Sequence, residues 1–155
     1  FAVLLTQSNN TPDRLTPANP LFEKIRIRLT PSPQVLIIDD DPFITEIIRA
    51  SLDMDGTYTV LTAPSGKNAQ EILADTIPDI IVLDLMLEDM SGMELLHRIT
   101  SRHSLRSTPV IVLTGSDEPD IRRQALAAGA ACFQQKPFTP GELIAIIKEL
   151  LNQSS

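Results

Sequence analysis

Short, uninterrupted runs of apolar residues recur along this chain, and segments with helical spacing separate them. The run at residues 80–83 has no helical periodicity; Pro78-Asp79 precedes it and an acidic, glycine-containing loop follows it. Runs of this kind are typical of strands that are buried on both faces of a parallel sheet. The pattern predicts strands at residues 34–39, 58–63, 80–84, 109–114 and 131–135.

Apolar residues at helical spacing follow each predicted strand, and capping residues mark where the helices begin. Asp41 before Pro42 predicts the start of the first helix, because aspartate caps helices well and proline suits the first helical position. Ser91 with Glu94 three residues later is a capping-box pattern. The remaining helices are predicted to begin at Ser65-Gly66, at Asp117 or Glu118 before Pro119, and at Thr139-Pro140, and the fourth to end at Gly129.

This regular alternation of strands and helices predicts a parallel sheet covered on both faces. Two architectures of this size compete: a flavodoxin-like three-layer (βα)5 sandwich with strand order 2-1-3-4-5, and one half of a Rossmann-like fold. A nucleotide or flavin site needs a glycine- or hydroxyl-rich first turn. Here that turn is Asp39-Asp40-Asp41-Pro42, which would repel a phosphate unless a cation intervened. The 2-1-3-4-5 order is therefore favoured, and it places Asp39 and Asp40 beside Asp84.

Polar residues stand at the carboxyl ends of four predicted strands: Asp39 and Asp40, Asp84, Thr114 and Lys136. A single aspartate there would usually be a turn or cap residue. The repetition points instead to a phosphate-and-metal site, because ligands bind at this edge of open α/β sheets. Clustered carboxylates suit Mg²⁺, and an aspartate beside that ion can attack a phosphoryl group. Lys136 and the Thr114 hydroxyl can supply positive charge and a hydrogen bond.

The amino-acid composition limits which partners and which cellular compartment are expected. The net charge of −7 argues against nucleic acid as the primary partner. A single cysteine, Cys132, forms no internal disulfide, which fits a reducing cytoplasm. No apolar run reaches the roughly 18 residues that span a bilayer, so no direct membrane contact is expected.

Residues 1–33 differ in composition from the rest of the chain. Their composition predicts a linker or arm, and residues 34–155 are predicted to form the globular domain. Within the arm, residues 1–5 could end a preceding domain. Residues 24–29 alternate like a half-buried strand, which predicts a short amphipathic arm packed on the domain or a basic strip that reaches for an acidic partner. The prolines that mark this segment are Pro12, Pro17, Pro20, Pro31 and Pro33.

Four motifs resemble those of the receiver domain of two-component response regulators, over residues 34–152. In family order and spacing, they are Val35-Leu36-Ile37-Ile38-Asp39-Asp40-Asp41, Val82-Leu83-Asp84-Leu85-Met86-Leu87, Val112-Leu113-Thr114-Gly115 and Phe133-Gln134-Gln135-Lys136-Pro137-Phe138. The resemblance implies that Asp84 accepts a phosphoryl group from a sensor histidine kinase or a phosphotransfer protein. It also implies a Mg²⁺ ion held by Asp39, Asp40, Asp84 and the backbone carbonyl of Met86.

The same resemblance implies roles for residues around this site. Lys136 would pair with the phosphoryl group, and the Lys136–Pro137 peptide bond would be cis. Thr114 and Phe133 would form a switch, and the fourth helix, fifth strand and fifth helix could form a homodimer face. The domain would catalyse only its own phosphorylation and dephosphorylation, so it would not be a turnover enzyme.

Three positions depart from the family pattern. Glu88 stands where proline is common, which puts metal affinity in question. Phe133 replaces the usual tyrosine and loses its hydroxyl, so an inward ring is expected even without phosphate. Gln134 is polar where an apolar residue is common, which suggests a wetter or partner-facing fifth strand.

The motifs leave alternatives for the function and for the organisation of the whole chain. A receiver fold could serve as a docking module that needs no phosphorylation. A phosphatase of the haloacid dehalogenase type would need an acid two residues after its nucleophile, where this chain has Met86. The chain could be a single-domain regulator or the C-terminal receiver of a longer protein such as a hybrid kinase.

Overall fold

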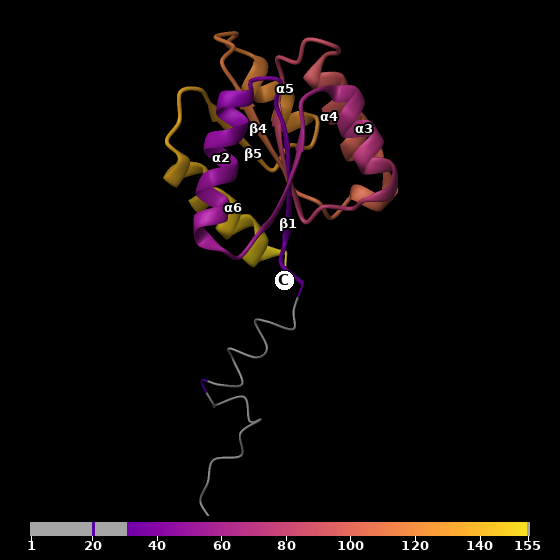
Figure 1. The fold of residues 1–155 in the computed structure, drawn as a ribbon. Helices are drawn as coiled ribbons and strands as arrows, with labels where there is room; N and C mark the ends of the chain where they lie inside the picture. Colours follow the sequence, from indigo (N-terminus) through magenta and orange to yellow (C-terminus); the bar gives the residue numbers. More distant parts are fainter. Residues whose placement is uncertain (1–19, 21–30, 155) are drawn as a thin grey trace, which may run out of the picture. The chain divides into compact units, whose positions relative to one another are not determined.

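The computed structural model describes residue 20 and residues 31–154, and a parallel five-stranded sheet forms the centre of this fold (Figure 1). The sheet has the order β2-β1-β3-β4-β5, which confirms the flavodoxin-like prediction over the Rossmann-like half. The segments 1–5 and 24–29, whose sequence patterns resemble strands, lie outside the described residues. The strands are β1 (Gln34–Ile38), β2 (Thr59–Ala63), β3 (Ile80–Asp84), β4 (Val110–Thr114) and β5 (Cys132–Gln135).

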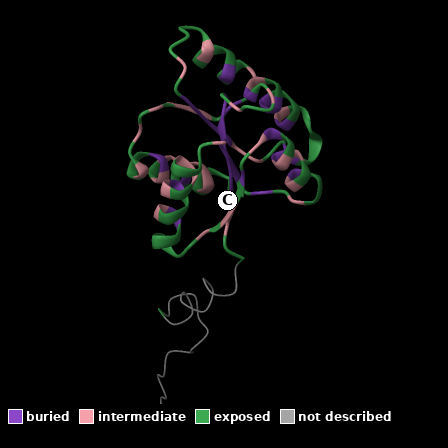
Figure 2. Cartoon of the chain, turned by 45° about the horizontal axis from the view of Figure 1, so that its top comes forward, coloured by how far each residue is buried: buried purple, intermediate pink, exposed green. Residues whose placement is uncertain are grey.

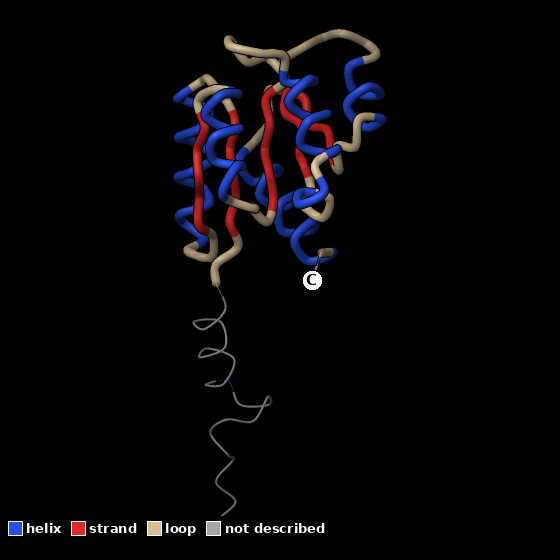
Figure 3. Tube along the Cα trace, turned by 90° about the vertical axis from the view of Figure 1, so that its right-hand side faces the viewer, coloured by secondary structure: helices blue, strands red, loops and turns tan. Residues whose placement is uncertain are grey.

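Helices cover both faces of the sheet, so the fold has three layers (Figure 3). One apolar cluster joins the sheet to α2 and α6, and a second joins its other face to α3, α4 and α5. The helices are α2 (Pro42–Asp55), α3 (Gly66–Asp75), α4 (Gly92–Ser101), α5 (Ile121–Ala127) and α6 (Pro140–Gln153), with a short 3-10 helix η1 (His103–Leu105).

The strands at the centre of the sheet are buried along their length, as Figure 2 shows. Alternate residues of β1 face opposite layers: Val35 packs with α2 and α6, and Leu36 with α3, α4 and α5. Both faces are therefore apolar, which explains why the sequence shows continuous apolar runs. The edge strand β5 is only half-buried, in keeping with the polar Gln134 in it.

Side-chain caps fix where the first and last helices begin. Asp41 Oδ1 accepts hydrogen bonds from the backbone N–H groups of Phe43 (2.8 Å) and Ile44 (3.3 Å). Thr139 and Glu142 form a full capping box at the start of α6. Both predicted starts are confirmed, and the loops that carry the polar residues at the sheet edge are anchored by them.

Two predictions about helix starts were partly wrong. Ser91 accepts from the backbone of Glu94, but the Glu94 carboxylate pairs with Arg98 one turn further on, so the capping box is incomplete. The fourth helix, α5, begins at Ile121 rather than at Pro119. A turn precedes it, because the Glu118 N–H bonds Ser116 Oγ and the Glu118 carbonyl accepts from the N–H of Ile121. Its predicted end at Gly129 is confirmed, with that glycine at φ 100°.

Replacing Asp41 by alanine should lower the free energy of unfolding by about 1 kcal/mol, because two N–H groups of α2 lose their acceptor. Chemical denaturation measures the difference. Asp75→Ala is the control, since Asp75 is an exposed helix residue without a side-chain hydrogen bond or ion pair among the residues that the structure describes. A loss in Asp41→Ala no greater than in this control would contradict the capping role.

Candidate functional site

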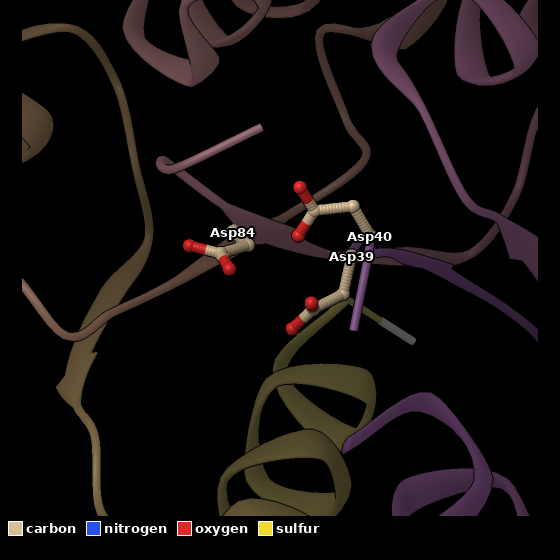
Figure 4. Close-up of side chains that lie close together, drawn as sticks. All are labelled: Asp39, Asp40 and Asp84. Atoms are coloured by element: carbon tan, nitrogen blue, oxygen red, sulfur yellow. The ribbon is translucent and has the colours of Figure 1, made fainter. Parts of the chain in front are cut away.

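Three carboxylates meet at the carboxyl edge of the sheet. Asp39 and Asp40 follow β1, and Asp84 ends β3, which pairs with β1 so that Ile38 lies opposite Leu83. One oxygen from each carboxylate lies within 4.8 Å of the others. The close-up in Figure 4 shows the three side chains lying close together. Asp39 and Asp84 are only 3% and 5% exposed, whereas Asp40 is partly exposed. The predicted acidic residues are therefore brought together, with one side open to solvent.

Lys136 balances the two buried carboxylates. Its Nζ lies 2.9 Å from Asp39 Oδ2 and 2.8 Å from Asp84 Oδ2. Burial lowers the pKa of Lys136, but the hydrogen bonds and charges of Asp84 and Asp39 outweigh it and hold the pKa above its ordinary value. The side chain is therefore a cation. The Lys136 N–H also donates to the Thr114 carbonyl (2.8 Å), and the Lys136–Pro137 peptide bond is cis.

Burial has the opposite effect on the acid that faces this lysine. It raises the pKa of Asp39 above the ordinary value, although the hydrogen bonds from Lys136 and from the Asp41 N–H act to lower it. That backbone bond joins Asp41 N to Asp39 Oδ1 over 2.9 Å. A buried carboxylate of this kind gains from any further positive charge placed beside it.

The loop after β3 is tied to the acidic residues through its backbone. The N–H of Met86 donates to Asp84 Oδ1 (2.9 Å), and the N–H of Glu88 donates to Asp40 Oδ2 (3.1 Å). Proline at position 88 would have no N–H to make the second bond. Met86 is 61% exposed, and it pairs with Ser91 across the loop. The loop closes tightly, because a Cβ on Gly92 would lie 2.3 Å from the Cα of Leu85.

The hydroxyl and the aromatic ring of the predicted switch lie on the next two strands. Thr114 is fully buried at the end of β4, and its Oγ1 accepts from the N–H of Ser116 (3.1 Å). Phe133 on β5 is half-buried against the α3–α4–α5 layer. The guanidinium carbon of Arg122, on α5, lies 5.8 Å from the centre of its ring, within the range of a cation–π contact.

Two contacts near this site could not be predicted from the sequence. Asp89 bonds the backbone of Gly66 and Lys67, and the Arg122 side chain lies over Phe133. Each contact joins residues on different elements of the fold, and such a contact leaves no pattern in the local sequence.

The donor set suits a hard divalent cation. Three carboxylates supply oxygen ligands, and the partly exposed Asp40 leaves room for the waters that Mg²⁺ keeps. Burial raises the pKa of Asp39, so a cation beside it would favour its charged carboxylate form. These residues therefore fit a magnesium ion. Among the helices that the structure describes, none has the length and hydropathy needed to cross a bilayer.

Comparisons with known proteins assign this arrangement to a family. The model of the response regulator receiver domain matches residues 35–148, a range that contains every residue discussed in this section. The phosphate regulon transcriptional regulatory protein PhoB of Pseudomonas aeruginosa is 38% identical over 120 residues, which are 77% of this chain and 52% of that protein. The chain thus spans about half the length of this curated relative.

Solved structures agree with this assignment. The receiver domain of the Francisella response regulator 1452 is 30% identical, with a TM-score of 0.72 over 79% of this chain and 99% of that one. The receiver domain of a signal transduction histidine kinase from Syntrophus aciditrophicus is also 30% identical, with a TM-score of 0.72 over 78% and 91%. Response regulators are signalling proteins rather than turnover enzymes. The chain belongs to the response regulator receiver domain family and contains the receiver domain of a two-component response regulator.

Proposed function

We propose that Asp84 accepts a phosphoryl group from a phosphohistidine on a sensor kinase or a phosphotransfer protein. The observation that carries this proposal is the setting of its carboxylate. One oxygen accepts from the Met86 N–H and the other from Lys136, while Asp39 and Asp40 lie alongside. A nucleophile that is held on a rigid strand and surrounded by charge-balancing groups suits in-line phosphoryl transfer.

In the proposed reaction, a carboxylate oxygen of Asp84 attacks phosphorus. The P–N bond to the donor imidazole breaks, and the nitrogen keeps the bonding electron pair. Asp39, Asp40, Asp84 and the Met86 carbonyl would hold Mg²⁺, which supplies positive charge for the phosphoryl oxygens. Lys136 would move its ion pair from the carboxylates to those oxygens, and Thr114 Oγ1 would donate a hydrogen bond to one of them.

The signal would leave the site through Thr114 and Phe133. They lie on the adjacent strands β4 and β5. Phe133 belongs to the α5–β5–α6 face, which we assign to partner binding or to homodimer formation. The P. aeruginosa relative is named as a transcriptional regulator. Because this chain carries a net charge of −7, we assign its described part to a protein partner rather than to nucleic acid.

Asp84→Asn should abolish the phosphoryl adduct that forms when the protein is incubated with acetyl phosphate and Mg²⁺, because the amide is not a nucleophile. Intact mass spectrometry detects the adduct. Asp79→Asn is a matched control just before the other end of β3, where the Asp79 side chain accepts from the Gln34 N–H (2.7 Å), and it should keep the adduct. An adduct that survives in Asp84→Asn would contradict the assignment.

Mg²⁺ affinity should depend on Asp40 much more than on its neighbour Asp41. Asp40→Ala removes a ligand and should raise the Kd at least about tenfold. Asp41→Ala removes a helix cap that faces α2 and should leave the Kd nearly unchanged. Calorimetric titration with Mg²⁺ compares the variants, and an equal loss in both would show that the ligands of the first loop are wrongly assigned.

The Phe133 ring should occupy nearly the same inward position in free and in beryllofluoride-bound protein. A ring without a hydroxyl prefers burial, which is worth about 1.5–3 kcal/mol for a side chain of this size. Crystal structures or aromatic NMR of the two states test this, with Phe133→Tyr as the matched control that regains a polar end. A ring that faces outward in the free protein and inward only with the phosphate mimic would refute this expectation.

A further inference from the structure

The loop between β3 and α4 is tied to the start of α3, a helix that contributes nothing to the acidic site. Asp89 Oδ1 accepts from the Gly66 N–H and Oδ2 from the Lys67 N–H, both over 2.9 Å. These donors belong to the first turn of α3, where backbone N–H groups have no partner within the helix. A carboxylate is favourable there, because it also meets the positive end of the helix dipole. One side chain thus joins two elements that are more than twenty residues apart.

A second contact strengthens the same junction. The Met90 side chain lies against Gly66 so closely that a Cβ on that glycine would be 2.2 Å from the sulfur. Gln70 Nε2, also on α3, lies 3.3 Å from the same sulfur. Hydrogen bonds from Gly66 and Lys67 lower the pKa of Asp89, so its carboxylate is ionised at neutral pH. The loop is therefore fastened to α3 by a charged bond pair and by packing.

The other side of this loop faces the acidic site. Glu88, the residue just before Asp89, donates its N–H to Asp40 (3.1 Å), and Met86 donates to Asp84. Adjacent residues thus hold the backbone between α3 on one side and the carboxylates on the other. Glu88 has no ring to fix its φ angle, so this part of the loop is restrained by its contacts with other elements. Asp89 supplies that restraint.

We propose that Asp89 is a positioning residue for the cation and phosphoryl site. By holding residues 86–91 on α3, it keeps the Glu88 N–H on Asp40 and the Met86 carbonyl in place. This inference rests on the proposed function, because it assigns Asp89 to the loop that would contribute a ligand. Asp89 acts through the backbone and touches no reacting atom.

The test compares Asp89→Ala with Ser65→Ala. Ser65 caps the same helix by accepting from the Asn68 N–H (3.1 Å), but it bonds no residue of the loop. Both variants should lower the Tm. Only Asp89→Ala should raise the Kd for Mg²⁺, by about tenfold, and speed hydrogen exchange at the Glu88 amide in metal-free protein. Asp89→Asn, whose single oxygen can still accept from one N–H, should fall between wild type and alanine.

Two results would contradict the positioning role of Asp89 without contradicting the proposed function. The first is wild-type Mg²⁺ affinity and wild-type Glu88 exchange in Asp89→Ala. The second is an equal rise in Kd in Ser65→Ala, which would mean that helix stability rather than the tie to the loop governs the site. A wild-type protein that binds no Mg²⁺ and accepts no phosphoryl group would overturn the proposed function together with the inference, so the two failures are distinguishable.

Discussion

The ammonium group of Lys136 between Asp39 and Asp84 is the interaction on which the site depends. Two nearly buried carboxylates at neighbouring strand ends would repel each other and would resist ionisation in a medium of low polarity. A single cation within 2.9 Å of both keeps them together without filling the space beside Asp40. This balance leaves the three carboxylates with an excess of negative charge, which suits a divalent cation beside them.

The sheet explains how residues from four distant segments reach one place. Parallel strands all end at the same edge, and the β1–β3 pairing sets Asp39 next to Asp84. The β3–β4 and β4–β5 pairings then carry Thr114 and Lys136 to the same edge. Each residue ends or directly follows a strand that packs between two apolar layers, so the positions of the functional groups are set by the packing of the core.

Much of this arrangement could be predicted from the sequence, because strands buried on both faces leave unmistakable apolar runs. The acidic first turn favoured the strand order 2-1-3-4-5, because it would repel the phosphate of a nucleotide unless a cation intervened. The predicted start of α5 was wrong because the Glu118 N–H donates to Ser116 Oγ and a turn forms before the helix, which local capping signals do not reveal. The hydrogen bond from Gly66 to Asp89 and the position of Arg122 over Phe133 depend on tertiary packing. Such contacts produce no periodic pattern in the sequence.

Much of the geometry around the carboxylates is held by backbone N–H groups. Asp39, Asp40 and Asp84 each accept from one, supplied by Asp41, Glu88 and Met86 respectively. The side chains of Met86 and Glu88 are exposed, so their identity can change while these bonds persist. Proline at position 88 is the exception, because it would exchange the bond to Asp40 for a fixed φ angle. This chain keeps the N–H of Glu88, and the next residue, Asp89, restrains the loop. The Asp89 side chain thus takes the place of a proline ring at position 88.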